Sequence, residues 1–170
     1  MHIHAYEKLW LACSVLLILF LIGTVTYGAV GPGIAMVADS EQPIDAQNLD
    51  ESERFADPGV EQVGENEYAA YVVAYQFGFT PDPIVVPANS TVTFYVTSRD
   101  VTHGFEVAGT NANTMVIPGE VATLTVETAE PQEYGLLCNE YCGAAHHAME
   151  GKVNVVSQSE FESRQGGDGE

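Results

Sequence analysis

Four side chains that bind soft or borderline metal ions lie within twelve residues near the C-terminal end of the sequence: Cys138, Cys142, His146 and Met149. A thiolate and a thioether together favour copper over harder divalent ions. One cysteine with a histidine and a methionine would suggest a mononuclear blue copper site. Two cysteines separated by three residues can instead bridge two metal ions. The sequence therefore predicts a copper site and favours a binuclear one.

A binuclear site needs a second imidazole, and His103 is the candidate, thirty-five residues before Cys138. A histidine taken alone is more often structural than metal-binding. The case for His103 rests on the need for one more nitrogen ligand and on its place immediately before an expected strand. His147 is adjacent to His146 and is expected to face solvent or to make an outer contact.

This arrangement resembles the binuclear copper domain of cytochrome c oxidase subunit II, in the b-type branch of the haem–copper oxidases. The resemblance implies that Cys138 and Cys142 bridge two copper ions, and that His103 and His146 each bind one of them. It also implies that Met149 and the backbone carbonyl of Glu140 are weak ligands. Other matching segments are Ala5–Lys8 with Trp10-Leu11, Phe77–Phe79 with Pro81 and Pro83, His103–Phe105 and Ile117–Val121.

Several other interpretations of the cysteine and histidine residues remain open from the residues alone. The spacing from Cys138 to Met149 also fits one face of a helix, although Gly143 is a poor helix former. Two cysteines and two histidines can bind zinc, but Met149 would then have no role. The cysteines can also form a disulfide, or belong to a thioredoxin-like copper chaperone. The disulfide leaves the neighbouring His and Met unexplained, and a chaperone of that kind needs alternating helices and strands.

A long apolar segment precedes the expected copper domain. No charged residue occurs from Leu9 to Ala38, and the most apolar part, Leu11 to Val30, is long enough to span a bilayer as a helix. We expect residues 1–38 to be a retained, single-pass membrane anchor. A signal peptide cleaved near Ala35 is the alternative. The resemblance, rather than the charge around the anchor, implies that the copper domain lies on the outer face of the cell membrane.

The sequence is strongly acidic, with 24 Asp and Glu residues, five Lys and Arg residues and a formal net charge of -19. Before Asp39 only Glu7 and Lys8 are charged, so the excess lies beyond the anchor. Such a surface can attract a basic partner, or it can be a hydrated surface typical of high-salt proteins. The shortage of lysine favours the second explanation. No basic patch suggests nucleic-acid binding.

The rest of the sequence predicts one all-β domain. We expect an acidic linker at 39–64, a copper domain at 65–157 and a flexible acidic tail at 158–170. Alternation of apolar and polar residues predicts a half-buried strand at Thr91–Thr97. Further strands are expected at 68–75, 104–108, 121–128, 133–137 and 152–156, separated by turns rich in Pro, Gly and Asn. Short strands without a convincing helix beyond the anchor indicate a β-sandwich or barrel. The resemblance implies a cupredoxin-like Greek-key topology.

The resemblance also implies the function of this domain: an electron relay in a terminal oxidase. A soluble donor, either a cytochrome c or a small blue copper protein, would pass electrons to the two copper ions. The copper centre would pass them to haem in subunit I, where oxygen is reduced. The expected partners are therefore subunit I, the donor and the lipid bilayer. The alternatives are the copper domain of a nitrous or nitric oxide reductase, a quinol oxidase subunit, which lacks these ligands, and a membrane-anchored copper chaperone.

Overall fold

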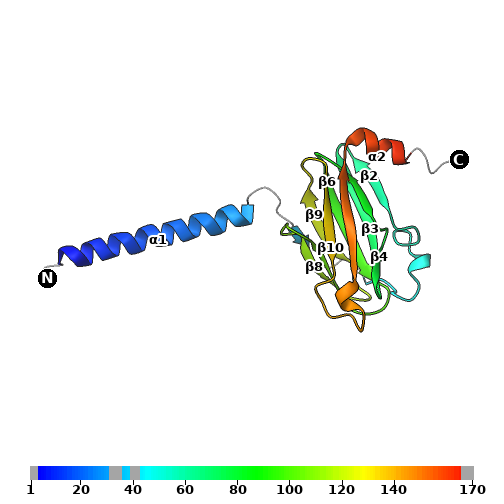
Figure 1. Ribbon diagram of the computed structural model, residues 1–170, viewed down its shortest axis with the longest axis horizontal. Coiled ribbons are helices and arrows are strands. Elements are labelled where there is room, and N and C mark those ends of the chain that lie inside the picture. Colours follow the sequence, from blue (N-terminus) through cyan, green and yellow to red (C-terminus); the bar gives the residue numbers. More distant parts are fainter. Residues whose placement is uncertain (1–3, 31–35, 39–42, 166–170) are drawn as a thin grey trace.

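The computed structural model describes residues 4–30, 36–38 and 43–165, and the elements discussed below lie within these ranges. It contains one long N-terminal helix and one β-sandwich (Figure 1). Helix α1, Ala5–Val30, is long and apolar enough to cross a membrane over Ala5–Gly28. Its apolar side chains are exposed from Leu9 to Tyr27, as expected for a helix whose natural surroundings are lipid. The predicted apolar helix is therefore present.

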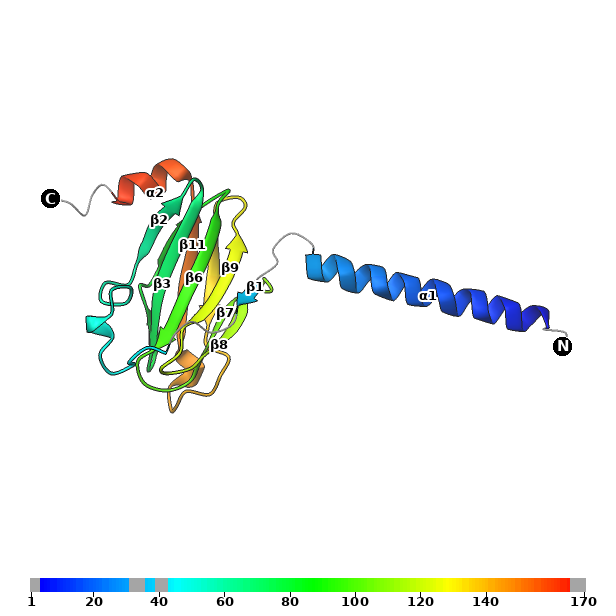
Figure 2. The same ribbon diagram turned by 180° about the vertical axis from the view of Figure 1, so that it is seen from behind.

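Two sheets face each other in the sandwich (Figures 1 and 2). The first has the strand order β1-β9-β6-β3-β2, with β4 paired to β3, and the second has the order β5-β11-β10-β7-β8. The strands are β1 Met36–Ala38, β2 Val60–Gly64, β3 Glu67–Tyr75, β4 Gly78–Thr80, β5 Ile84–Pro87, β6 Thr91–Ser98, β7 His103–Val107, β8 Asn113–Val116, β9 Ala122–Glu127, β10 Gln132–Leu137 and β11 Glu150–Val156. This confirms the predicted all-β fold, and a strand lies at each of the positions where one was expected.

The core lies between the two sheets and follows the alternation of the strands. In β6, Val92, Phe94 and Val96 are fully buried, whereas the intervening Thr93 and Tyr95 are only half-buried. Phe105 of β7 meets Phe94 and Phe79 from the opposite sheet, with ring centroids 5.4 and 6.0 Å away. The core therefore packs β7, the strand that begins with His103, against β4 and β6 of the opposite sheet.

Residues 43–64 differ from the predicted solvated linker, most of which lies in the described part of the chain. Leu49, in the short helix η1 (Leu49–Glu51), and Phe55 are buried on the outer face of the first sheet, together with Val73 and Val121. Strand β2 then extends that sheet. We call residues 43–59 the strap. The strap is acidic in composition, but the two buried side chains of Leu49 and Phe55 hold it on the sheet.

The predicted frayed tail is also partly ordered. Helix α2, Gln158–Gln165, follows β11 directly. Its Phe161 is buried, with its ring edge-on to Tyr68 at a centroid distance of 5.2 Å, and the amide of Gln158 donates a hydrogen bond to the Tyr68 hydroxyl. The tail prediction was wrong for 158–165, because a single well-placed aromatic residue anchors an otherwise polar helix. Residues 166–170 lie outside the described residues.

Candidate metal centre

The cysteine-rich loop connects β10 to β11 at one end of the sandwich, opposite the end that carries α2 (Figure 1). It contains the short helix η2, His146–Ala148, and no longer helix, so the helical interpretation of the cysteine spacing is wrong. Gly143 adopts a φ of +134°, a backbone conformation that other residues rarely adopt. This conformation helps the loop return its later residues toward Cys138.

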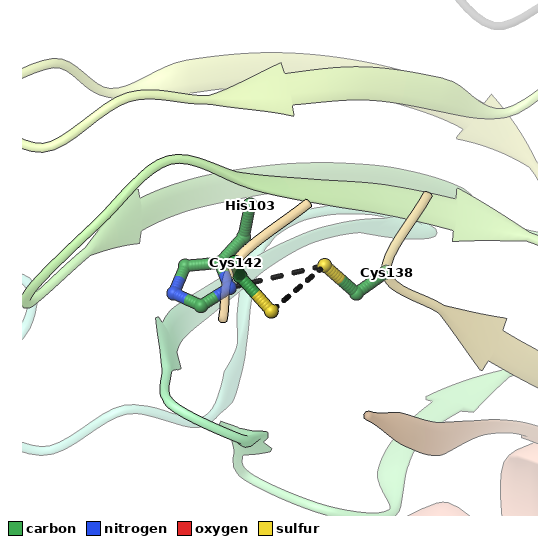
Figure 3. A group of neighbouring side chains, drawn as sticks. All are labelled: His103, Cys138 and Cys142. Carbon is green, nitrogen blue, oxygen red and sulfur yellow. Dashed lines mark hydrogen bonds between the residues drawn. The ribbon is translucent and has the colours of Figure 1, made fainter. Parts of the chain in front are cut away.

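The two thiols and His103 come together in the buried interior of this end of the domain (Figure 3). The Sγ atoms of Cys138 and Cys142 are 3.8 Å apart, and the Nδ1 atom of His103 is 3.8 Å from the Cys138 Sγ atom. Both cysteines are free thiols. His103 is the first residue of β7, which pairs with β10 in the same sheet. The cysteine-rich loop follows directly after β10, so His103 and the loop lie at neighbouring strands.

The remaining predicted residues complete a cluster around the two sulfur atoms. The Nδ1 atom of His146 lies 3.6 Å from the Cys142 Sγ atom, and the Met149 Sδ atom lies 3.5 Å from it. The backbone oxygen of Glu140 lies 3.2 Å from the Cys138 Sγ atom. The structure therefore places all six predicted residues together, with one imidazole beside each thiol. His147 is exposed and lies outside the cluster.

Gly104 brings the start of β7 close to the sulfur of Cys138 and to the loop that follows it. The backbone N–H of Gly104 points to the Cys138 Sγ atom at 3.4 Å. A side chain on Gly104 would collide with Asn139, whose amide donates a hydrogen bond of 3.1 Å to the Asn113 side chain. Glycine at 104 therefore allows β7 to approach the start of the loop.

Asp100 orients His103 from the outside. Its Oδ1 atom is 2.8 Å from the His103 Nε2 atom, so the imidazole presents Nδ1 to the thiols. Burial raises the pKa of Asp100, but hydrogen bonds from His103 and from the backbone N–H groups of Gln76 and Val101 outweigh it and lower the pKa below its ordinary value. The carboxylate therefore stays charged at neutral pH. Sequence reasoning missed Asp100, because an acidic residue three positions before a candidate ligand does not by itself indicate a contact with it.

The Cys142 thiol favours its protonated state while no metal is bound. Burial, together with the hydrogen bond and charge of neighbouring Cys138, raises the pKa of the Cys142 thiol to about 11. A metal ion binds the thiolate form, so metal uptake at neutral pH must release protons. The donor set of two sulfurs, two imidazole nitrogens, a thioether and a carbonyl suits copper.

Comparison with known proteins agrees with this geometry. Residues 69–156 match the family described as cytochrome c oxidase subunit II, periplasmic domain. Subunit 2 of the cytochrome c oxidase of Thermus thermophilus is 40% identical over 154 residues, which cover 89% of this chain and 92% of that protein. Subunit 2 of the heme-copper oxidase of Aeropyrum pernix is 34% identical over 111 residues, which cover 57% of this chain and 47% of that protein.

Solved structures extend the comparison to the fold. A chain of a heme-copper terminal oxidase dimer, determined by cryo-EM, superposes with a TM-score of 0.61 at 30% identity, over 89% of this chain and 99% of that chain. The periplasmic domain of subunit II of the Bradyrhizobium japonicum cytochrome oxidase gives a TM-score of 0.53 at 22% identity, over 56% and 88% of the two chains. The second likeness confirms the cupredoxin-like fold. The chain thus belongs to the cytochrome c oxidase subunit II family, a family of copper proteins that form part of haem–copper oxidase complexes.

Proposed function

We propose that the cluster around Cys138 and Cys142 holds two copper ions. The observation that carries this proposal is the pairing of each thiol with its own imidazole: His103 beside Cys138 and His146 beside Cys142, at 3.8 and 3.6 Å. Two cysteine sulfurs placed between two histidines can bridge two metal ions, with one nitrogen ligand for each. Met149 and the Glu140 carbonyl then add one weak ligand on each side.

Copper held by these residues would supply one-electron transfer, and the chain's own residues determine how the site is held and shielded. Most of the side chains that would hold copper are buried, so little rearrangement is expected when the charge of the site changes. Cys138, Cys142 and Met149 are all at most 8% exposed, and His103 is fully buried. The protein thereby excludes water from most of the cluster, and the contacts of Asp100 with His103 and of the Gly104 N–H with Cys138 hold these two side chains in place.

We further propose that electrons enter from a soluble donor, a cytochrome c or a small blue copper protein, and leave toward haem in subunit I. His146 is the more exposed of the two imidazoles, and Tyr141 stands edge-on to it with a centroid distance of 5.8 Å. Tyr141 is 79% exposed, and Leu137 and Phe77 add further exposed apolar surface beside the loop. An apolar surface near His146 suits a donor that docks without charge steering.

The proposed orientation places the β-sandwich outside the cell membrane, with α1 as its single anchor. The apolar surface of α1 and the membership of the periplasmic-domain family support this arrangement. Labelling of single cysteines introduced at exposed positions of α2, for example Ser159→Cys, tests the orientation in intact cells or right-side-out vesicles. A membrane-impermeant maleimide is expected to label this site without permeabilisation. Labelling only after permeabilisation would reverse the proposed orientation.

The experiment that tests the copper proposal uses the full chain in detergent, since residues 43–64 contribute to the fold. Copper is measured per chain, and electron paramagnetic resonance is recorded on the oxidised protein. We expect an unpaired electron shared by two copper nuclei. A spectrum that localises the electron on one nucleus would exclude the binuclear centre.

A further inference from the structure

Gln76 joins two parts of the metal cluster that come from different segments of the chain. It lies in the turn between β3 and β4, which belong to the sheet opposite the cysteine-rich loop. Its backbone N–H donates a hydrogen bond of 2.7 Å to the Asp100 Oδ2 atom, and its side-chain amide donates to the backbone carbonyl of Cys142. Asp100 in turn contacts the imidazole of His103.

The loop is shaped to receive this turn. A Cβ atom on Gly143 would lie 2.7 Å from the Gln76 Nε2 atom and 3.2 Å from the Phe77 ring. The Cys142–Gly143 peptide therefore packs directly against the tip of the hairpin. Cys142 is 3% exposed, so its side chain is packed on all sides. A change in the orientation of this peptide would therefore move the Cys142 sulfur.

We propose that Gln76 is a positioning residue that holds the Cys142 sulfur in register with His103. The inference rests on the proposed function of the cluster as a copper site. Gln76 acts on the cluster through the Cys142 carbonyl on one side and through Asp100 on the other. The amide also points the positive end of its dipole toward Cys142, which stabilises the more negative, reduced state of the centre.

The arrangement allows the two roles of Gln76 to be separated. Replacement of its side chain leaves the backbone N–H available for Asp100, so only the bond to the Cys142 carbonyl is lost. Gln76→Ala removes the donor, and Gln76→Glu replaces it with a carboxylate that, when charged, cannot donate and adds negative charge. Gln165→Ala is a matched control, because the Gln165 amide also donates to a backbone carbonyl, that of Val60, at the end of the domain that carries α2.

The test measures three quantities on the full chain in detergent. A lost hydrogen bond of about 0.5–1.5 kcal/mol corresponds to a factor of about 2–13. We therefore expect Gln76→Ala to release copper to a chelator about 2- to 10-fold faster than the wild type. The reduction potential is expected to fall in the order wild type, Gln76→Ala, Gln76→Glu. In the metal-free protein, the amides of Gly143 and Ala144 are expected to exchange hydrogen faster in Gln76→Ala. Gln165→Ala is expected to match the wild type in all three.

The outcomes separate this inference from the copper proposal. If the wild type shows a shared-electron signal but both Gln76 variants keep its potential, copper release rate and loop exchange, Gln76 has no positioning role. Equal changes in Gln76→Ala and Gln165→Ala would also overturn it, since the effect would then be a general loss of stability. If the wild type itself shows no binuclear signal, the copper proposal fails. Amide exchange in the metal-free Gln76→Ala protein still tests whether Gln76 positions the loop.

Discussion

The sulfur atoms of Cys138 and Cys142 lie 3.8 Å apart, well beyond the roughly 2.05 Å of a disulfide bond. The two residues are free thiols whose side chains converge from opposite ends of a five-residue turn. Each thiol has a different imidazole beside it, His103 at Cys138 and His146 at Cys142. This relationship separates the site from a one-cysteine copper site and from a structural disulfide.

Replacement of Met149 by leucine is expected to keep copper bound while shifting the reduction potential. The Met149 Sδ atom lies beside Cys142 at 3.5 Å, in the position of a weak ligand, and weak axial ligands tune the potential more than they hold the metal. Copper analysis and redox titration measure the two effects. Glu140→Gln is the matched control, because the backbone oxygen of residue 140 contacts Cys138 and the substitution leaves that oxygen in place. An unchanged potential in Met149→Leu would remove Met149 from the ligand set.

Removal of the Phe55 ring is expected to destabilise the domain by about 3–5 kcal/mol, the range for a buried Phe→Ala change. Phe55 is 1% exposed, and its ring meets Tyr71 edge-on at 5.9 Å. Denaturant unfolding of the full chain in detergent measures the loss. Val63→Ala is the control: Val63 is 60% exposed in the neighbouring β2, and its replacement should cost less than about 0.5 kcal/mol. Equal losses in the two variants would show that the strap contributes no packing.

Because of Tyr71, the stability of the domain is expected to fall at alkaline pH. Burial and a hydrogen bond with Glu61 raise the pKa of Tyr71 to about 12 in the folded protein, from about 10 in an unfolded chain. Between these values the unfolded chain loses the proton and the folded one keeps it, so the free energy of unfolding falls as pH rises from about 10 to about 12.

Tyr71→Phe is expected to reduce this fall, and Tyr75→Phe, a change in the more exposed tyrosine of the same strand, should leave it intact. Urea unfolding at a series of pH values from 8 to 11.5 provides the measurement. If the wild type and Tyr71→Phe lose stability in parallel over this range, the raised pKa does not contribute.

Salt is expected to stabilise the β domain. Its net charge is strongly negative and the few cations, such as Arg99 and Lys152, already contact the acidic Asp50 and Glu133. At 1 M salt the Debye length is about 3 Å, so repulsion among the exposed carboxylates is largely screened. Thermal unfolding in potassium chloride from low to molar concentration tests this, because chloride avoids the general stabilisation that sulfate gives. Greatest stability at low salt would contradict it.

The sequence predicted the parts of the fold that have a local pattern. Thr91–Thr97 alternates strictly and became β6, and the cysteine-rich spacing identified the loop that the structure places around the sulfur pair. Ile84–Pro87 was not expected as a strand, because prolines flank a short apolar run, yet it pairs in parallel with β11. The strap was missed because Leu49 and Phe55 are isolated among acidic residues.

The support of the metal cluster was harder to predict than its ligands. Gln76 and Asp100 are common polar residues with no diagnostic spacing from the cysteines. They reach the cluster only because the β3–β4 turn and the β6–β7 connection meet at the same end of the sandwich. Such contacts depend on tertiary packing, which no local pattern encodes.

The copper content and electronic state of the full chain test the central claim most directly. Metal analysis and electron paramagnetic resonance are applied to the wild type and to Cys142→Ser, since serine cannot provide a bridging thiolate at neutral pH. We expect two copper ions per chain with an electron shared between them in the wild type, and loss of the shared signal in Cys142→Ser. One copper per chain, or a shared signal that survives in Cys142→Ser, would contradict it.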